Sequence, residues 1–361
     1  MNASDSSSLN ESDKHTPPFS LRTDTQCCVP LRGPENLPIP TLCCTDASLQ
    51  SRSGIVPKIK HIVLSGGGGT GLAYYGALRE SHKDGFWNIS DIETMHGVSC
   101  GSLFIFIIAM HNHISWEDYD DYLIKRPWET VCGFSPDKLL NAFNNIGICD
   151  RETIELTIAP ILRAVDLSLN ITLQELYDFT NIELHFHTTN LDTYKLVDLS
   201  YKTHPDWTVV DAIYSSSALP LLFRPNRMNG EVYADGGFLC NYPLQQCIDQ
   251  VENQDEIFGL NKTHLTDTTV LENEDLNNHA STKEYKNITE YLLDIITKTV
   301  KKLIVEKTHS KYTMDICDTK TSVWEVYEAL KTKETRAAKI QYGAQKWEEF
   351  KTKIGFVPEP H

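Results

Sequence analysis

The sequence lacks an excess of basic residues. Its 33 lysines and arginines are outnumbered by 49 aspartates and glutamates, which gives a formal net charge of -16. Proteins that bind nucleic acid carry a basic surface, so this deficit argues against nucleic acid as a partner. The same deficit predicts little long-range attraction to anionic membranes. Any contact with lipid must therefore be local and apolar.

Long apolar runs are also missing. The longest one covers residues 103–110, far below the ~20 residues that cross a bilayer. Residues 1–20 are rich in Ser, Asn and Asp and do not resemble a signal peptide. We therefore expect a cytoplasmic protein whose association with membranes is peripheral and transient. In that reducing compartment most of its 10 cysteines are expected to be free thiols.

Cysteine pairs with the usual spacing of a zinc site do not stand out. Two pairs of adjacent cysteines, Cys27-Cys28 and Cys43-Cys44, lie in a polar N-terminal stretch, whereas zinc usually takes Cys-x2-Cys. We interpret these pairs as incidental thiols, with reversible acylation of a flexible tail and a metal site as the alternatives. No metal and no cofactor are expected.

The chain has enough apolar residues, 40% of the total, to bury a substantial core. Residues 1–57 are polar and interrupted by prolines, which predicts a disordered extension. Residues 58–250 are expected to form the main folded domain, with a helical insertion over 113–180. Residues 251–282 are predicted to be a polar acidic loop, and residues 283–361 to be helices packed on that domain.

Strand and helix patterns alternate from residue 60 onward. This order predicts a three-layer α/β/α fold with a mixed, mostly parallel central sheet. The expected strands follow short apolar runs, at 60–64, 92–96, 182–188, 194–199 and 231–234. The expected helices lie at 71–84, 101–112, 136–145, 150–165, 209–216, 284–307 and 321–352, and residues 172–175 have the spacing of a capping box.

A run of glycines follows the first of these strands. Gly66, Gly67, Gly68 and Gly69 are consecutive, and Gly71 begins the next helical pattern. A strand, a glycine turn and a helix together direct unpaired backbone N–H groups at an anion. Without Cβ atoms these glycines let the backbone approach a substrate closely. The four are therefore candidate donors of an oxyanion hole.

About thirty residues later the chain reads Gly97-Val98-Ser99-Cys100-Gly101. This is strand, sharp turn and helix with a serine at the apex, the geometry of an exposed nucleophile. The pattern alone is weak, because it occurs by chance in about one chain of this length in ten. Together with the glycine run, it predicts that Ser99 is a nucleophile beside its own oxyanion hole.

A serine hydroxyl needs a base to take its proton. In Asp235-Gly236-Gly237 a carboxylate follows a short strand and precedes two glycines, as in an active site where a turn presents the carboxylate. A Ser99–Asp235 dyad is sufficient if burial raises the pKa of Asp235. Histidines after Asp235 are found outside strand ends and glycine turns, at positions 264, 279, 309 and 361.

From Lys60 to Leu244, about half of its length, the chain resembles a patatin-like phospholipase. The match rests on motifs in the family's order and spacing. They are the glycine run 66–71, the serine motif 97–101, the segment 188–193, the serine and proline block 215–225, the aspartate motif 235–237 and Asn241-Tyr242-Pro243.

The resemblance implies an acyl hydrolase of the phospholipase A or lysophospholipase type that acts on membrane glycerolipids without a metal. Ser99 would attack the ester, Asp235 would accept its proton, and amides around Gly67 and Gly68 would hold the oxyanion. Two positions depart from the family pattern. Thr70 replaces a frequent Lys or Arg, which leaves recognition of a phosphate headgroup open. Asn190 replaces the usual aspartate, a change that we interpret as structural.

Three other functions compete with this interpretation. Gly66, Gly68 and Gly71 also fit a dinucleotide fingerprint with Asp91 twenty residues on, but that function leaves Ser99 and Asp235 unexplained. A lipid-binding or scaffold protein could retain the motifs without activity. An acyltransferase could use the same acyl-enzyme.

Two further features have a structural and a functional interpretation. We expect His96, beside the serine motif, to pack at a strand end, with a catalytic role as the alternative. We expect the helical pattern 284–307 to pack on the core, with membrane binding as the alternative.

Overall fold

The structure is a computed structural model that describes residues 58–132, 147–220, 222–263, 308–317 and 323–358. The strands are β1 (His61–Leu64), β2 (Thr94–Val98), β3 (Glu183–Asn190), β4 (Lys195–Leu199), β5 (Asn226–Met228), β6 (Glu231–Asp235), β7 (Ile257–Thr263) and β8 (Tyr312–Cys317). The α-helices are α1 (Gly71–Lys83), α2 (Cys100–Ala109), α3 (Trp116–Lys125), α4 (Trp128–Val131), α6 (Arg151–Ala164), α7 (Leu173–Thr180), α8 (Val209–Ser217), α9 (Leu244–Ile248), α12 (Val323–Leu330) and α13 (Lys333–Ile354). Short 3-10 helices are η1 (Gly68–Thr70), η2 (Ile89–Asp91), η3 (Gly236–Phe238) and η4 (Gln254–Glu256).

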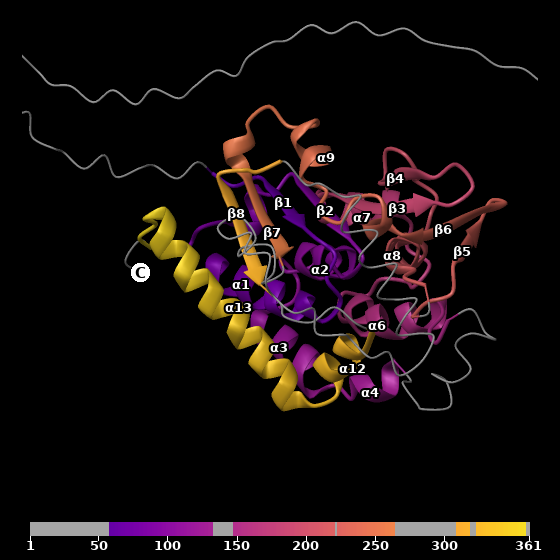
Figure 1. The fold of residues 1–361 in the computed structure, drawn as a ribbon, viewed down its shortest axis with the longest axis horizontal. Coiled ribbons are helices and arrows are strands. Elements are labelled where there is room, and N and C mark those ends of the chain that lie inside the picture. Colours follow the sequence, from indigo (N-terminus) through magenta and orange to yellow (C-terminus); the bar gives the residue numbers. More distant parts are fainter. Residues whose placement is uncertain (1–57, 133–146, 221, 264–307, 318–322, 359–361) are drawn as a thin grey trace, which may run out of the picture. The chain divides into compact units, whose positions relative to one another are not determined.

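These strands form one mixed sheet (Figure 1). Its order is β5-β6-β3-β2-β1-β7-β8, and β4 also pairs with β3. All neighbours from β3 to β8 are parallel. The pairs that involve β4, β5 and β6 are antiparallel. The expected mixed, mostly parallel sheet is thus confirmed.

Successive side chains of β1 enter two different cores, because strand residues alternate between the faces of a sheet. Ile62 and Leu64 belong to the main core, which includes side chains of α1, α2 and α13. Val63 packs in a smaller core with Leu244 and Cys247 of α9. The short helix α9 therefore covers the face opposite to α1 and α2. This arrangement confirms the expected three-layer α/β/α fold.

Helix α13 lies along α1, with their backbones in direct contact (Figure 1). A Cβ atom on Gly76 of α1 would lie 2.0 Å from the carbonyl oxygen of Ile340. A Cβ atom on Gly343 of α13 would lie 1.9 Å from the carbonyl oxygen of Ala73. Each helix therefore needs a glycine where the other crosses it.

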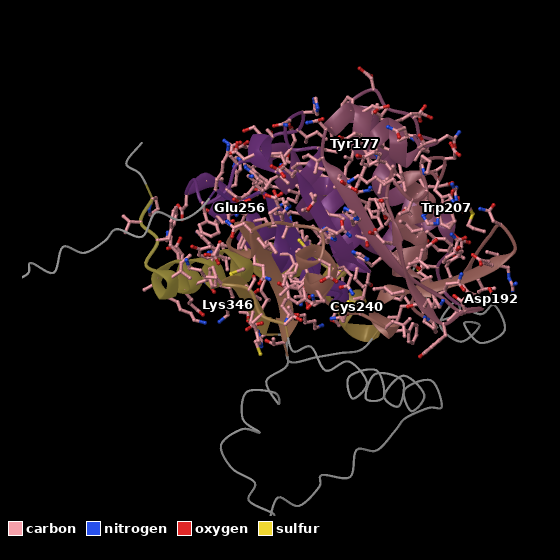
Figure 2. All side chains as sticks on the ribbon, turned by 90° about the horizontal axis from the view of Figure 1, so that it is seen from above. Tyr177, Asp192, Trp207, Cys240, Glu256 and Lys346 are labelled. Carbon is pink, nitrogen blue, oxygen red and sulfur yellow. The ribbon has the colours of Figure 1, made fainter. Side chains whose placement is uncertain are left out.

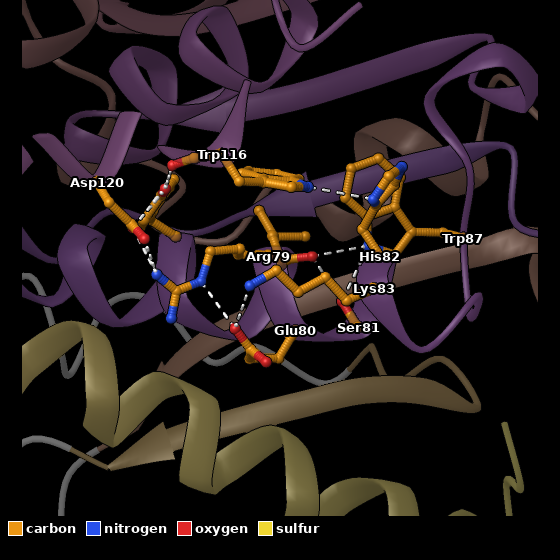
Figure 3. A network of polar contacts seen from close by, with 10 residues as sticks. Arg79, Glu80, Ser81, His82, Lys83, Trp87, Trp116 and Asp120 are labelled. Atoms are coloured by element: carbon orange, nitrogen blue, oxygen red, sulfur yellow. Dashed lines mark hydrogen bonds and ion pairs between the residues drawn. The ribbon is translucent and has the colours of Figure 1, made fainter. Parts of the chain in front are cut away.

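A polar network fixes another side of α1 to α3 (Figure 3). Arg79 donates to one carboxylate oxygen of Asp120 at 2.6 Å and to Glu80 at 2.8 Å. The hydroxyl of Tyr75 donates to the same Asp120 carboxylate at 2.8 Å. Only 12% of the Arg79 side chain is exposed, so solvent screens this ion pair less than one at the surface. Helix α1 is thus held by both α3 and α13.

The prediction of a polar loop over 251–282 is wrong for residues 257–263, which form β7. This strand pairs with β1 on one side and β8 on the other. Its apolar half, Ile257 to Leu260, is buried, as is typical of a central parallel strand. The run is short and surrounded by acidic residues, so its burial was not evident. Residues 264–282 lie outside the described residues.

The prediction that residues 283–361 contribute only helices is also wrong, because 312–317 form β8. The sheet therefore continues beyond the predicted domain end at residue 250. The predicted helix 321–352 is two helices, since α12 ends at Leu330 and Thr332 caps the start of α13. The predicted helix 284–307, like residues 1–57 and the helix 136–145, lies outside the described residues.

The insertion 113–180 carries α3, α4, α6 and α7 in its described parts. Thr172 and Glu175 form the predicted capping box of α7. Asp150 precedes α6, but its side chain makes no capping hydrogen bond. In the described ranges no helix combines the length and apolar character needed to cross a membrane.

We predict that Gly343→Val lowers the free energy of unfolding by about 2–3 kcal/mol, because its side chain would separate α13 from α1. Chemical denaturation measures this loss. The matched control is Gln345→Ala on the exposed side of the same helix, which should change stability by less than about 0.5 kcal/mol. Equal stability of the two variants would contradict the close contact.

Candidate active site

The last residues of β2 and β6 pair with adjacent residues of β3. Val98, the last residue of β2, pairs with His187 of β3, and Asp235, the last residue of β6, pairs with the next residue, Thr188. Ser99 follows Val98 directly. Two residues separated by 136 positions in the sequence are therefore brought together by adjacent residues of one strand, close enough for the Ser99 side chain to lower the pKa of Asp235.

Ser99 occupies a strained turn between β2 and α2. Its φ of 55° and ψ of -123° are uncommon for a residue with a side chain, and such strain often marks functional positions. The backbone packs closely on both sides of this turn. A Cβ atom on Gly101 would lie 2.6 Å from the carbonyl oxygen of Leu64, and one on Gly97 would lie 2.7 Å from Gly101.

The turn is held by the end of α8. The hydroxyl of Ser216 accepts a hydrogen bond from the N–H of Ser99 at 3.0 Å and donates to the carbonyl oxygen of His187 at 2.6 Å. It also contacts the hydroxyl of Ser102 at 2.6 Å. Ser217 donates to the carbonyl oxygen of Ser99 at 3.2 Å. The serine block of the sequence therefore positions Ser99, a role that its residues alone did not indicate.

Asp235 is buried, with 4% of its surface exposed. Burial raises its pKa to about 6, while hydrogen bonds from Ser99 and from the backbone of Gly237 act in the opposite direction. The Gly237 N–H donates to Asp235 Oδ1 at 2.7 Å. A Cβ atom on Gly236 would lie 2.2 Å from the carbonyl oxygen of His187, so glycine is required where this turn crosses β3.

The glycine turn lies against both of these elements. A Cβ atom on Gly66 would lie 3.2 Å from Cβ of Ser99. The N–H of Gly66 already donates to the carbonyl oxygen of Asn241 at 2.8 Å, so the prediction that it serves an oxyanion is wrong. Burial raises the pKa of the Cys100 thiol to about 12, and the backbone of Gly67 and Gly71 acts in the opposite direction.

Gly68 and Gly69 begin η1, just before α1. In the described part of the chain their N–H groups donate to no backbone acceptor, which leaves them as candidate anion donors. Gly68 has a φ of 56°, a conformation that favours glycine. The start of α1 at Gly71 packs on α2, because a Cβ atom there would lie 2.3 Å from the Phe104 ring. The helix therefore adds its positive end to this turn.

Asn241 joins the two glycine turns. In the sequence, only its place in a motif of the family indicated a role for it. Its side-chain amide donates to the carbonyl oxygen of Gly66 at 3.2 Å, and its backbone carbonyl oxygen accepts a hydrogen bond from the N–H of Gly66. A Cβ atom on Gly237 would lie 3.1 Å from its Oδ1. Asn241 thus sets the spacing between the glycine turn and the turn that carries Asp235.

The other sequence candidates lie elsewhere. His96 is fully buried and stacks on His185, and its position in β2 places it on the sheet face of Val63. Asp91 lies in η2 and pairs with Lys58 at 2.6 Å, before β2 rather than after it. Of the histidines after Asp235, His309 precedes β8, and positions 264, 279 and 361 lie outside the described residues.

The two departures from the family pattern have different surroundings. Thr70 is buried at the end of η1. Asn190 ends β3, where its Oδ1 accepts hydrogen bonds from the backbone of Asp192 and Thr193, each at 3.0 Å. The asparagine side chain therefore shapes the turn after β3. Among the described residues no group of three or more His, Cys, Asp or Glu side chains is arranged to hold a metal ion.

The chain is similar in sequence to proteins of a known family. The family model described as patatin-like phospholipase matches residues 62–248, more than half of the chain. The probable lipid hydrolase 463L of Invertebrate iridescent virus 6 is 27% identical over 191 residues, which are 52% of this chain and 63% of that protein. An uncharacterized protein of Acanthamoeba polyphaga mimivirus is 27% identical over 69% of this chain and 83% of its own length.

Solved structures give weaker matches. VipD from Legionella pneumophila has a TM-score of 0.43 and 17% identity, over 82% of this chain and 67% of its own. The type III effector protein ExoU, found in Pseudomonas aeruginosa, has a TM-score of 0.39 and 13% identity, over 84% of this chain and 55% of its own.

We predict that Ser216→Ala lowers the free energy of unfolding by about 1–3 kcal/mol, because it leaves the Ser99 N–H without its acceptor. Urea denaturation of the full chain measures the loss. Ser90→Ala, at the exposed position of η2, is the matched control and should be close to neutral. A loss no larger than that of the control would contradict this role of Ser216.

Proposed function

Because the chain belongs to the patatin-like phospholipase family, we propose that it is a lipid acyl hydrolase. It cleaves carboxylic esters of glycerolipids through an acyl-enzyme on Ser99, with Asp235 as the base. The observation that carries the proposal is that Ser99, in its strained turn, follows the strand end beside the buried carboxylate of Asp235, whose pKa the Ser99 side chain lowers. This pairing brings a nucleophile and a base into contact without a histidine.

The proposed reaction has two halves. In the first, Ser99 Oγ bonds to the ester carbonyl carbon while its proton passes to the Asp235 carboxylate, and the carbonyl oxygen becomes an oxyanion. The carbon–oxygen bond to the leaving alcohol then breaks, and the alcohol takes the proton from Asp235. In the second, Asp235 accepts a proton from water as the water attacks the acyl group, and returns it to Ser99 Oγ as the acid leaves.

The oxyanion is assigned to the glycine turn. Gly68 and Gly69 offer N–H groups without a backbone acceptor in the described part of the chain, at the positive end of α1. Gly67 belongs to the same turn, and its backbone lowers the pKa of the Cys100 thiol. Donors fixed in place before the reaction stabilise the developing charge without reorganisation, and each is worth on the order of 3 kcal/mol.

The substrate is proposed to be a membrane glycerolipid, cleaved in the manner of a phospholipase A or a lysophospholipase. The turn after β3 exposes Leu191 and Tyr194, at 43% and 60% of their surface, at the end of the sheet where Ser99 lies. Figure 2 shows Asp192, on this same turn, at the outer edge of the described residues. Local apolar contact of this kind suits a chain with net charge -16, and we propose that it occurs transiently in the cytoplasm.

We predict that Ser99→Ala and Asp235→Asn each lower ester hydrolysis by about a thousandfold or more, because each removes one half of the dyad. Hydrolysis of a mixed lipid extract, followed by mass spectrometry of the products, measures the loss. Ser99→Ala should also abolish labelling by a fluorophosphonate.

The matched controls are Ser90→Ala and Asp91→Asn, two exposed or half-buried positions of η2 that should keep wild-type turnover. Full activity of either dyad variant would overturn the mechanism. A wild-type protein that hydrolyses no phospholipid, lysophospholipid or triacylglycerol would support a lipid-binding role. Acyl transfer to an added alcohol in place of hydrolysis would support an acyltransferase.

We predict that kcat/KM falls as the pH is lowered through about 6, because Asp235 must be ionised to accept a proton and its pKa is raised to about 6. A soluble p-nitrophenyl ester assayed in mixed buffers measures the profile. Since the folded state binds this proton more tightly than the unfolded state, the ionised carboxylate also opposes folding above that pH. Asp235→Asn should therefore be at least as stable as the wild type at pH 8. An acid limb near pH 4 would contradict the burial of the base.

A further inference from the structure

Strand β7 extends past the end of β1 and lies beside the glycine turn. Leu64, the last residue of β1, pairs with Leu260, and β7 continues to Thr263. The next contact along this edge is a hydrogen bond from the N–H of Ser65 to the carbonyl oxygen of Leu260 at 3.1 Å. Lys262 then lies next to the glycines. The family match ends at residue 248, before this strand begins.

Lys262 is attached to the turn through both its backbone and its side chain. Its N–H donates to the hydroxyl of Ser65 at 2.8 Å, and that hydroxyl contacts the hydroxyl of Tyr74 in α1 at 2.6 Å. Its ammonium group donates to the carbonyl oxygen of Gly67 at 3.2 Å. The aliphatic part follows Gly67 closely, since a Cβ atom there would lie 2.9 Å from Cδ of Lys262.

The carbonyl oxygen that accepts the hydrogen bond from the ammonium group belongs to the peptide bond that joins Gly67 to Gly68. The same carbonyl oxygen accepts a second hydrogen bond, from the N–H of Thr70 at 3.2 Å. A peptide is planar and trans, so the N–H of Gly68 points away from the Gly67 carbonyl. Two donors on the oxygen therefore fix the direction of the Gly68 N–H. A positive charge on the oxygen also polarises the peptide, which strengthens that N–H as a donor.

The charge of Lys262 also reaches the residue after Ser99. It acts on the thiol of Cys100, where it opposes the effect of burial. The lysine is half-buried at the edge of the described residues, so solvent screens it only in part. This position differs from that of Thr70, which is buried in η1 and carries no charge.

We propose that Lys262 is a positioning residue of the oxyanion hole. It orients and polarises the peptide bond between Gly67 and Gly68, so that the N–H of Gly68 is aligned before an oxyanion forms. The inference rests on the proposed function, because it assigns the Gly68 N–H to an oxyanion. It predicts a contribution to the transition state and none to binding of the uncharged ester.

The test uses the full chain with Lys262→Met, Lys262→Gln and Lys262→Arg. Lys262→Met keeps the aliphatic length and removes the charge, and Lys262→Arg restores a charged donor. If Lys262→Met does not fold, Lys262→Gln, which is also uncharged, takes its place. Lys311→Met is the matched control, because Lys311 precedes β8 at the opposite end of the neighbouring parallel strand and is exposed.

Each variant is assayed for kcat and KM on p-nitrophenyl butyrate, and for inhibition by an alkyl trifluoromethyl ketone and the methyl ketone of equal chain length. The serine adds to the carbonyl of the trifluoromethyl ketone, and the adduct carries an oxyanion. The methyl ketone binds as an uncharged carbonyl. We expect Lys262→Met to lower kcat by about tenfold to a hundredfold with KM changed by less than about twofold, below the loss for deleting one donor. Affinity for the trifluoromethyl ketone should fall in parallel, and affinity for the methyl ketone should not.

Lys262→Arg should recover most of the lost kcat, and Lys311→Met should match the wild type. Unchanged kcat and trifluoromethyl ketone affinity in Lys262→Met, with Ser99→Ala inactive, would overturn this inference and leave the proposed function standing. Equal weakening of both ketones, or no recovery in Lys262→Arg, would assign Lys262 a purely structural role and overturn the inference. Wild-type hydrolysis by Ser99→Ala would overturn the proposed function, and this inference with it.

Discussion

The site depends on the close approach of three backbone turns. The turn with Ser99, the turn with Asp235 and the glycine turn come from distant parts of the sequence and meet where the strands end. Gly101 crosses the end of β1, and Gly236 crosses β3, each at a distance that excludes a Cβ atom. Because protein interiors are packed as densely as crystals, these crossings leave little freedom in the relative positions of the turns. A serine and a carboxylate that exchange a proton, as proposed for Ser99 and Asp235, require that rigidity.

The electrostatics of the site follow from the same packing. Burial of Asp235 raises its pKa to about 6, which makes it a better proton acceptor than an exposed carboxylate while leaving it ionised at neutral pH. The glycine turn has the opposite character, with the positive end of α1 and the ammonium group of Lys262 on the carbonyl of Gly67. In the proposed reaction Asp235 becomes neutral when it accepts the Ser99 proton, and the negative charge then lies on an oxyanion beside the glycine turn.

The parts of the site that carry short-range sequence signals were predictable, whereas the parts held by long-range contacts were not. The glycine run, Ser99 and Asp235 each follow a strand and carry their own turn residues, so their local structure was predictable. Ser216, Asn241 and Lys262 act through contacts with residues 117, 175 and 195 positions away. Ordinary polar residues do not specify such partners. The strand β7 was missed for a related reason, because a short apolar run in an acidic segment has no clear period.

Strand β7 and helix α13 make the C-terminal part of the chain a structural element of the site. Helix α1 begins at the glycine turn, and α13 packs along it through Gly76 and Gly343. On its β7 side, the glycine turn is attached through hydrogen bonds from Lys262 to Ser65 and Gly67. The direction of the helix and the orientation of the glycine peptides are therefore fixed by residues beyond the family match at 62–248. The glycine run, Ser99 and Asp235 lie in the matched segment, but the glycine turn is also held by contacts with the residues that follow it.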